Sequence, residues 1–129
     1  MALSAVAAIF DTPLRPRLEV IAATTADSAA RYAKAYGFAR ATEDWRDLVA
    51  DPKVQAVVIA SPQWTHRAIA EAAFAAGKPV FCEKPLGASL ADAKAMVAAV
   101  TKSAQGMGGA LAWPALLRKL DKQDPGYKL

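Results

Sequence analysis

The sequence contains 129 residues, of which 54% are hydrophobic and 22% are charged. That length suits one domain, and the composition supports a buried core and excludes intrinsic disorder. The formal net charge of +4 comes mostly from the segment that starts at Lys102, where the basic residues do not form a cluster with stacking aromatic residues. We therefore expect a solvated tail rather than a nucleic-acid-binding surface.

Cysteine and histidine each occur once, as Cys82 and His66. A single copy of each excludes an internal disulfide and a Cys-rich or His-based metal cluster. The apolar start, Met1–Phe10, has no basic region and is interrupted by Asp11 and Pro13, so it is neither a typical signal peptide nor a membrane span. We expect a cytoplasmic protein with no metal and no membrane partner.

The first half of the sequence predicts helices alternating with strands. In chain order, we expect an Ala-rich helix over Met1–Phe10, a strand over Leu18–Ala23, a helix after it, and a short extended piece over Phe38–Ala41. Asp27 or Ser28 can cap that helix, and Gly37 stands where its end requires a left-handed residue. Thr42 is expected to cap a small helix that stops at Asp51.

The second half continues the alternation. Val54–Ala60 is a continuous apolar run, which predicts a strand buried on both faces. A helix over Thr65–Ala76 and a strand over Pro79–Cys82 follow, and then Ser89 caps a last helix. The apolar face of that helix would comprise Leu90, Ala93, Met96, Val97 and Val100. This order of elements predicts an α/β fold with a parallel sheet. The same order is also expected for a receiver domain or a flavodoxin-like fold.

Polar residues follow two of the predicted strands at the point where each ends. Ser61-Pro62-Gln63 comes after the strand over 54–60, with His66 close behind, and Glu83-Lys84-Pro85 comes after the strand over 79–82. In open parallel sheets, ligands bind outside the carboxyl ends of the strands. We therefore expect the functional site to lie here.

These ordered motifs resemble those of the Gfo/Idh/MocA family of oxidoreductases, whose dinucleotide-binding domain carries Thr/Ser-Pro-Asn-x-x-His and then Glu-Lys-Pro. The resemblance extends to Tyr36-Gly37, Asp51-Pro52, Ala76-Gly77-Lys78 and Cys82, and covers roughly 1–100. It implies a Rossmann-like doubly wound parallel sheet and NAD or NADP as cofactor. It also implies a sugar or polyol substrate and is compatible with a homo-oligomer.

The sequence departs from the family pattern near its start, because the first seventeen residues contain no glycine and hence no Gly-x-Gly-x-x-Gly turn. By the resemblance, residues 1–105 form a partial NAD(P)-binding domain that lacks the first strand and the Gly-rich loop. Residues 106–129 would then form the start of a last strand, over Gly106–Trp113, and a tail, with the substrate domain absent. This predicts direct pairing of Leu18–Ala23 with Val54–Ala60, poor solubility and weak nucleotide affinity.

The resemblance also implies roles for individual residues. Lys84 would be the catalytic residue near nicotinamide and substrate, against the alternative of a surface lysine in a strand-exit turn. Ser61, Pro62 and Gln63, where Gln63 replaces the usual Asn, would line the nicotinamide half of the cofactor. Thr24 would stand where an acid often binds the adenosine ribose, and it suits a 2′-phosphate.

Other roles stay open between two interpretations. Glu83 either ties into the loops or the cofactor ribose, or is a structural carboxylate. His66 either caps or orients its loop, or contacts the cofactor. Trp64 either flanks the cofactor or lies at a subunit contact. Pro85 shapes its turn and can be cis. We expect Cys82 to be a buried strand residue rather than a nucleophile, because no histidine base is assigned nearby.

The sequence thus predicts the remnant of an NAD(P)-dependent oxidoreductase that, in intact relatives, transfers hydride between nicotinamide and a sugar or inositol-type polyol. Two alternatives belong to other classes. One is a non-catalytic nucleotide-binding or assembly module, and the other is a decayed, inactive fragment. Three aromatic residues are expected in the hydrophobic core rather than at a ligand site: Phe38, Trp45 and Phe74.

Overall fold

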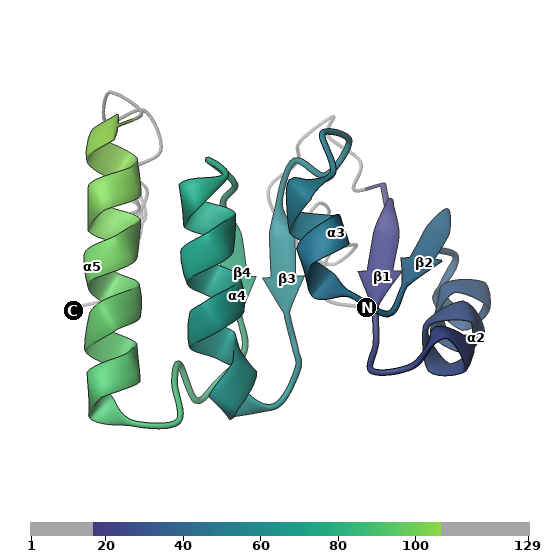
Figure 1. Cartoon of the computed structure of the whole chain (residues 1–129), viewed down its shortest axis with the longest axis horizontal. Helices are drawn as coiled ribbons and strands as arrows, with labels where there is room; N and C mark the ends of the chain where they lie inside the picture. Colours follow the sequence, from purple (N-terminus) through teal and green to yellow (C-terminus); the bar gives the residue numbers. More distant parts are fainter. Residues whose placement is uncertain (1–16, 107–129) are drawn as a thin grey trace, which may run out of the picture. The chain divides into compact units, whose positions relative to one another are not determined.

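The computed structural model describes residues 17–106, and the chain divides into two compact units, the first ending at Gln55 and the second starting at Ala56. The first unit contains β1 (Val20–Ala22), α2 (Ala26–Tyr36), β2 (Arg40–Thr42) and α3 (Trp45–Ala50). The second contains β3 (Val57–Ile59), α4 (Gln63–Ala75), β4 (Val80–Cys82) and α5 (Leu90–Gly106). Strands and helices therefore alternate as predicted (Figure 1). None of the described helices is long and apolar enough to cross a membrane.

The first unit is a parallel strand pair with helices on two sides. β1 and β2 run parallel, with Val20 opposite Arg40 and Ala22 opposite Thr42. Both helices contact the strands, α2 on one side and α3 on the other (Figure 1). Ala29 of α2 and Val49 of α3 are buried there. The strand predicted over 18–23 is confirmed at its centre, and the extended piece predicted over 38–41 is a true strand.

Helix α2 begins two or three residues earlier than predicted, depending on which of the two candidate caps is taken. Its N-cap is Thr25, whose side chain accepts a hydrogen bond from the amide of Ser28 at 3.2 Å. Asp27 and Ser28 therefore lie inside the first turn, because the extended backbone already ends at Thr25. At the other end the prediction is confirmed, since Gly37 takes a left-handed conformation with φ of 79°.

Helix α3 is also capped by a different residue than predicted. Asp44 is the N-cap and accepts a hydrogen bond from the Arg46 amide at 2.9 Å. This bond lowers the pKa of Asp44 below its ordinary value. Thr42 is instead the last residue of β2, and its hydroxyl accepts from the Asp44 amide at 3.1 Å. Sequence alone did not distinguish these two capping side chains, because both stand just before the helix.

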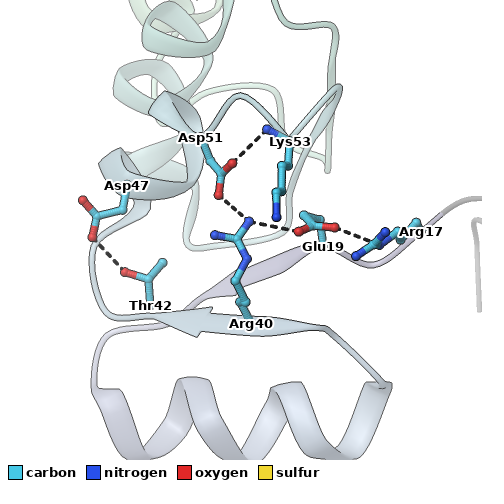
Figure 2. Close-up of polar contacts among 7 residues, drawn as sticks. All are labelled: Arg17, Glu19, Arg40, Thr42, Asp47, Asp51 and Lys53. Carbon is cyan, nitrogen blue, oxygen red and sulfur yellow. Dashed lines mark hydrogen bonds and ion pairs between the residues drawn. The ribbon is translucent and has the colours of Figure 1, made fainter.

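A network of charged side chains joins the strand starts of the first unit to the end of α3 (Figure 2). Arg40 pairs with Glu19, at 3.1 Å, and with Asp51. The Lys53 amide donates to Asp51 at 2.8 Å, and together with the Arg40 guanidinium it holds the pKa of Asp51 below its usual range. Arg17 pairs with Glu19 at 2.9 Å. The sequence analysis did not identify this network.

The second unit is built on the parallel pair of β3 and β4, in which Val57 lies opposite Val80 and Ile59 opposite Cys82. Helix α4 contacts both strands, and α5 packs against α4. The core on this side comprises Val57, Ile59, Ile69, Ala70, Ala73 and Met96. Val58 points the other way and is 50% exposed. Its register partner, Phe81, is 56% exposed. The prediction that β3 is buried on both faces is therefore wrong for the described residues.

The predicted apolar face of α5 is only partly correct. Met96 is buried and Ala93 is half-buried, whereas Leu90, Val97 and Val100 are exposed. The side that meets α4 continues instead to Ser103, whose hydroxyl donates to the Phe74 carbonyl of α4 at 3.1 Å. Because α4 is the main neighbour of α5 among the described elements, the buried stripe of α5 is narrower than its apolar sequence pattern.

Four further expectations concern strand pairing, the two ends of the chain and the core. The described residues form one two-stranded ladder in each unit, and the pairing of Leu18–Ala23 with Val54–Ala60 across the two units stays a prediction. Gly106 ends α5, and the rest of the last predicted strand lies outside the described residues, as does the helix predicted over Met1–Phe10. The core candidates Phe38, Trp45 and Phe74 are half-buried.

We predict that Arg40→Gln lowers the urea midpoint of the first unit by a small amount, because it breaks both ion pairs of Arg40. The pKa of Asp51 is depressed in the folded state, so its share of stability is present above the unfolded pKa and is lost as the pH falls. The difference from wild type should therefore shrink in acid and at high salt. The exposed Lys34→Gln makes the same charge change and serves as control. An effect equal to that of Lys34→Gln at neutral pH and low salt would contradict the role of this network.

Candidate functional site

The two polar loops singled out in the sequence begin side by side at the carboxyl ends of β3 and β4. Ile59 and Cys82 are register partners, and the Glu83 amide donates to the Ile59 carbonyl at 2.9 Å, which extends the ladder by one bond. Ser61 and Glu83 thus start their loops next to each other. The structure brings together the two motifs that the sequence placed at neighbouring strand ends.

His66 lies between these loops and is almost fully buried, at 1% exposure. Its Nε2 is 2.8 Å from the carbonyl oxygen of Ser61, and its Nδ1 is 3.1 Å from that of Pro85. These contacts match the orienting role, one of the two interpretations open from the sequence. Contact of the ring with a cofactor stays a prediction.

Cys82 is the third neighbour of the imidazole, with its sulfur 3.3 Å from Nδ1. The premise that no histidine lies near Cys82 is therefore wrong, and Cys82 is half-buried rather than buried as predicted. Burial, and then the negative charge of Glu83, raise the pKa of the Cys82 thiol above its ordinary value. A raised pKa favours the thiol over the nucleophilic thiolate, so Cys82 has the character of a strand residue that can donate a hydrogen bond.

The Ser61–Gln63 loop leads directly into α4, which begins two residues before the predicted start. The Thr65 hydroxyl donates to the Pro62 carbonyl at 2.7 Å and lies 2.6 Å from the Ser61 hydroxyl. Pro62 is the N-cap and provides no side-chain acceptor for the first turn. Gln63 and Trp64 are exposed there, Trp64 at 70%.

The second loop carries Glu83 and Lys84, both exposed. The Glu83 carboxylate accepts a hydrogen bond from the Lys84 amide at 3.0 Å, so it stabilises the turn in which it lies. The Lys84–Pro85 peptide bond is cis, in agreement with the sequence analysis. Within residues 17–106, the Lys84 ammonium has no hydrogen-bond or ion-pair partner.

A tight contact connects this loop to α5. A Cβ added to Gly87 would lie 2.9 Å from the Asp92 Cβ and 3.0 Å from the Ala93 amide nitrogen, so only glycine fits without a shift. Asp92 belongs to the predicted cap, in which the Ser89 hydroxyl accepts from the Asp92 amide at 3.1 Å. The Ser89 hydroxyl donates to the Asp92 carboxylate at 2.9 Å, and this bond and Arg67 lower the pKa of Asp92.

Arg67 links α4 to α5, because it pairs with Glu71 at 2.9 Å and with Asp92 at 3.3 Å. The sequence analysis did not predict this bridge, since the second partner comes from another helix. Thr24 lies in the first unit, exposed at the carboxyl end of β1. Among the described residues, no group of His, Cys, Asp and Glu side chains is arranged to hold a metal ion.

Comparison with known proteins identifies the family. The family described as "Oxidoreductase family, NAD-binding Rossmann fold" matches residues 3–107. The chain belongs to the Gfo/Idh/MocA oxidoreductase family. The predicted fold class is thereby confirmed, because the parallel strands and their helices match the Rossmann fold of that family.

Individual relatives agree with this assignment. The chain is 43% identical over 88 residues to levoglucosan dehydrogenase from Pseudarthrobacter phenanthrenivorans. The aligned residues make up 68% of this chain and 23% of that relative. It is 58% identical over 52 residues to inositol 2-dehydrogenase 1 from Saccharopolyspora erythraea, covering 40% of the chain and 15% of that relative.

Solved structures show the same likeness. Levoglucosan dehydrogenase in complex with NADH and levoglucosan superposes with a TM-score of 0.74 at 39% identity, over 79% of this chain and 28% of that one. An oxidoreductase domain protein from Kribbella flavida also gives a TM-score of 0.74, at 40% identity, over 81% of this chain and 28% of that one. The chain spans about a quarter of the length of these proteins.

We predict that Cys82 reacts slowly with iodoacetamide at neutral pH, because its raised pKa keeps it as the thiol. The rate should rise when urea unfolds the chain and when the pH is raised toward the thiol pKa. Since Cys82 is the sole cysteine, mass spectrometry of the intact chain reads this one site. A rate in the folded protein at neutral pH above that of the unfolded chain would contradict the prediction.

Proposed function

We propose that the loops after β3 and β4 form the nicotinamide side of an NAD(P) site in an oxidoreductase that acts on a CH–OH group of a sugar or polyol. The observation that carries the proposal is the buried His66 ring between the two loops, 2.8 Å from the Ser61 carbonyl and 3.1 Å from the Pro85 carbonyl that follows the Glu83-Lys84 turn. Relatives named levoglucosan dehydrogenase and inositol 2-dehydrogenase support the substrate class.

The groups exposed at these strand ends suit a ligand that carries a carboxamide. The first turn of α4 has no side-chain cap, and although the Thr65 amide donates to the Pro62 carbonyl, the amides of Gln63 and Trp64 can donate to a ligand carbonyl. The Gln63 side chain is exposed and offers both a donor and an acceptor. The backbone of Ser61 and Pro62 would lie against the nicotinamide ring of this ligand. When bound, the nicotinamide would supply the hydride acceptor or donor.

Lys84 is proposed as the catalytic residue. Its ammonium is exposed and, within the described part of the chain, is not engaged by another side chain. An ammonium can donate a hydrogen bond to the substrate oxygen and exchange a proton with it as the carbon changes between alcohol and carbonyl. Glu83 holds the backbone of the turn through the Lys84 amide, so that the Lys84 side chain remains available to substrate.

Thr24 is proposed to serve the adenosine half of the cofactor. It lies at the carboxyl end of β1, where parallel sheets bind ligands. A neutral threonine at this point can donate to a ribose hydroxyl and does not repel a 2′-phosphate. We therefore propose NAD or NADP as the cofactor.

Nicotinamide mononucleotide and AMP separate the two halves of the cofactor in a test of this assignment. We predict that millimolar nicotinamide mononucleotide shifts the backbone amide NMR signals of Ser61, Gln63, Trp64 and Lys84. AMP should leave these signals in place and shift those near Thr24. Equal shifts with both probes, or none with nicotinamide mononucleotide, would overturn the nicotinamide assignment.

Turnover tests the catalytic role of Lys84. We predict that Lys84→Ala lowers any NAD(P)-linked oxidation of levoglucosan or inositol by roughly 10²–10⁴-fold, the usual effect of removing a general acid or base. Lys94→Ala, an exposed lysine of α5, makes the same charge change away from the loops. Equal rates in the two variants would contradict the role of Lys84. Nicotinamide mononucleotide binding without any wild-type turnover would identify a non-catalytic binding module.

A further inference from the structure

The contacts of His66 raise a question of proton placement that involves Cys82. The buried ring has two nitrogens and three polar neighbours: the Ser61 carbonyl at 2.8 Å from Nε2, and the Pro85 carbonyl at 3.1 Å and the Cys82 sulfur at 3.3 Å from Nδ1. A neutral imidazole carries one N–H and one lone pair. The position of its proton therefore decides which of these contacts are hydrogen bonds.

The contact between Nε2 and the Ser61 carbonyl indicates whether Nε2 carries a proton. A carbonyl oxygen only accepts hydrogen bonds, so Nε2 must carry a proton to make a favourable contact with Ser61 at 2.8 Å. The opposite neutral tautomer would set the Nε2 lone pair against the Ser61 oxygen. This is the shortest of the three contacts, and it is therefore the one least able to tolerate two acceptors facing each other.

The Nδ1 contact leaves two arrangements. In one, Nδ1 is also protonated, which places a positive charge on a side chain that is only 1% exposed. No carboxylate forms an ion pair with His66 in the stretch 17–106, so this charge would be buried without compensation. In the other, Nδ1 keeps its lone pair and accepts a hydrogen bond from the Cys82 thiol. The contact of Nδ1 with the Pro85 carbonyl is then not a hydrogen bond, and at 3.1 Å it is the longer of the two carbonyl contacts of the ring.

The thiol is suited to this second arrangement. It has one proton to donate, and its other acceptors are more distant: the Glu83 carbonyl at 3.5 Å and the Leu86 carbonyl at 4.0 Å. Burial raises the pKa of Cys82, so the sulfur retains its proton. The neighbouring Glu83 adds to this effect, because its negative charge disfavours a thiolate.

We propose that Cys82 is a positioning residue for the candidate site, because its S–H donates to Nδ1 of His66 and holds the ring in the neutral, Nε2-protonated form that donates to the Ser61 carbonyl. The chain Cys82–His66–Ser61 then connects the end of β4 to the loop that opens α4. Lys84 follows Cys82 by two residues, so the same connection sets the Lys84 turn relative to Ser61–Gln63. This functional consequence rests on the proposed nicotinamide site.

The proton arrangement is measured directly by NMR of the imidazole nitrogens in the ¹⁵N-labelled full chain at neutral pH without nucleotide. Because His66 is the sole histidine, one imidazole spin system is observed. We expect Nε2 to resonate as a protonated nitrogen and Nδ1 as an unprotonated acceptor. Two protonated nitrogens, or a proton on Nδ1 alone, would overturn the proposal.

Three variants separate a hydrogen-bond donor from a merely structural residue. Cys82→Ala removes the donor, so the Nδ1 resonance should move away from that of a hydrogen-bonded acceptor, whereas Nε2 keeps its proton toward the Ser61 carbonyl. Cys82→Ser keeps a donor and should preserve the wild-type pattern. Val80→Ala trims the other end of β4 and should also preserve it. A wild-type pattern in folded Cys82→Ala, or its loss in folded Cys82→Ser, would contradict the proposal.

The same variants distinguish this inference from the proposed function. Nicotinamide mononucleotide should shift the Ser61 and Gln63 amides less in Cys82→Ala than in Cys82→Ser at equal probe concentration. A wild-type chain that shows the expected imidazole pattern without binding the probe would overturn the nicotinamide site alone. If Cys82→Ala does not fold, as judged by circular dichroism, the wild-type and Cys82→Ser spectra still decide the proton arrangement.

Discussion

The buried contact between the His66 ring and the Ser61 carbonyl is the interaction on which the candidate site depends. β3 and β4 are only three residues long, so their ladder contributes few hydrogen bonds and extends no further than Glu83, the first residue of the second loop. The loops therefore need a side-chain connection of their own. An imidazole meets this need because its two nitrogens point in different directions from one rigid ring, toward Ser61 on one side and toward Pro85 and Cys82 on the other.

Some charged side chains near this contact form ion pairs within the fold, whereas Lys84 remains available to a ligand. Arg67 is engaged by Glu71 and Asp92, and Asp92 also completes the cap of α5 through Ser89. Gly87 permits the loop to approach that cap closely. Lys84 stands apart, since no partner within residues 17–106 engages its ammonium. A surface cation that the fold leaves unpaired beside a rigid loop is suited to contact a substrate, because binding need not first break an ion pair.

The positions of the site motifs were predictable from sequence, but their internal contacts were not. Apolar runs that end in Ser61-Pro62-Gln63 and Glu83-Lys84-Pro85 mark strand ends, and a parallel sheet places such ends along one edge. The hydrogen bond of Glu83 to Ile59 and the cis bond before Pro85 agree with that prediction. The Cys82–His66 contact joins residues sixteen positions apart, and no local pattern indicates that their side chains converge. The same holds for Arg40, whose partners Glu19 and Asp51 come from separate elements.

The amino-acid sequence by itself determined the order of strands and helices, the left-handed turn at Gly37, the cap at Ser89 and the family, because these depend on local conformation and on motifs at fixed spacing. Only the tertiary structure decided which apolar residues are buried. Val58, Leu90 and Val97 have the same hydrophobic character as their buried neighbours, yet they are exposed because the elements that pack nearby cover one side of β3 and a narrow stripe of α5. Burial depends on what lies opposite a residue, and that is a property of the folded chain rather than of the residue.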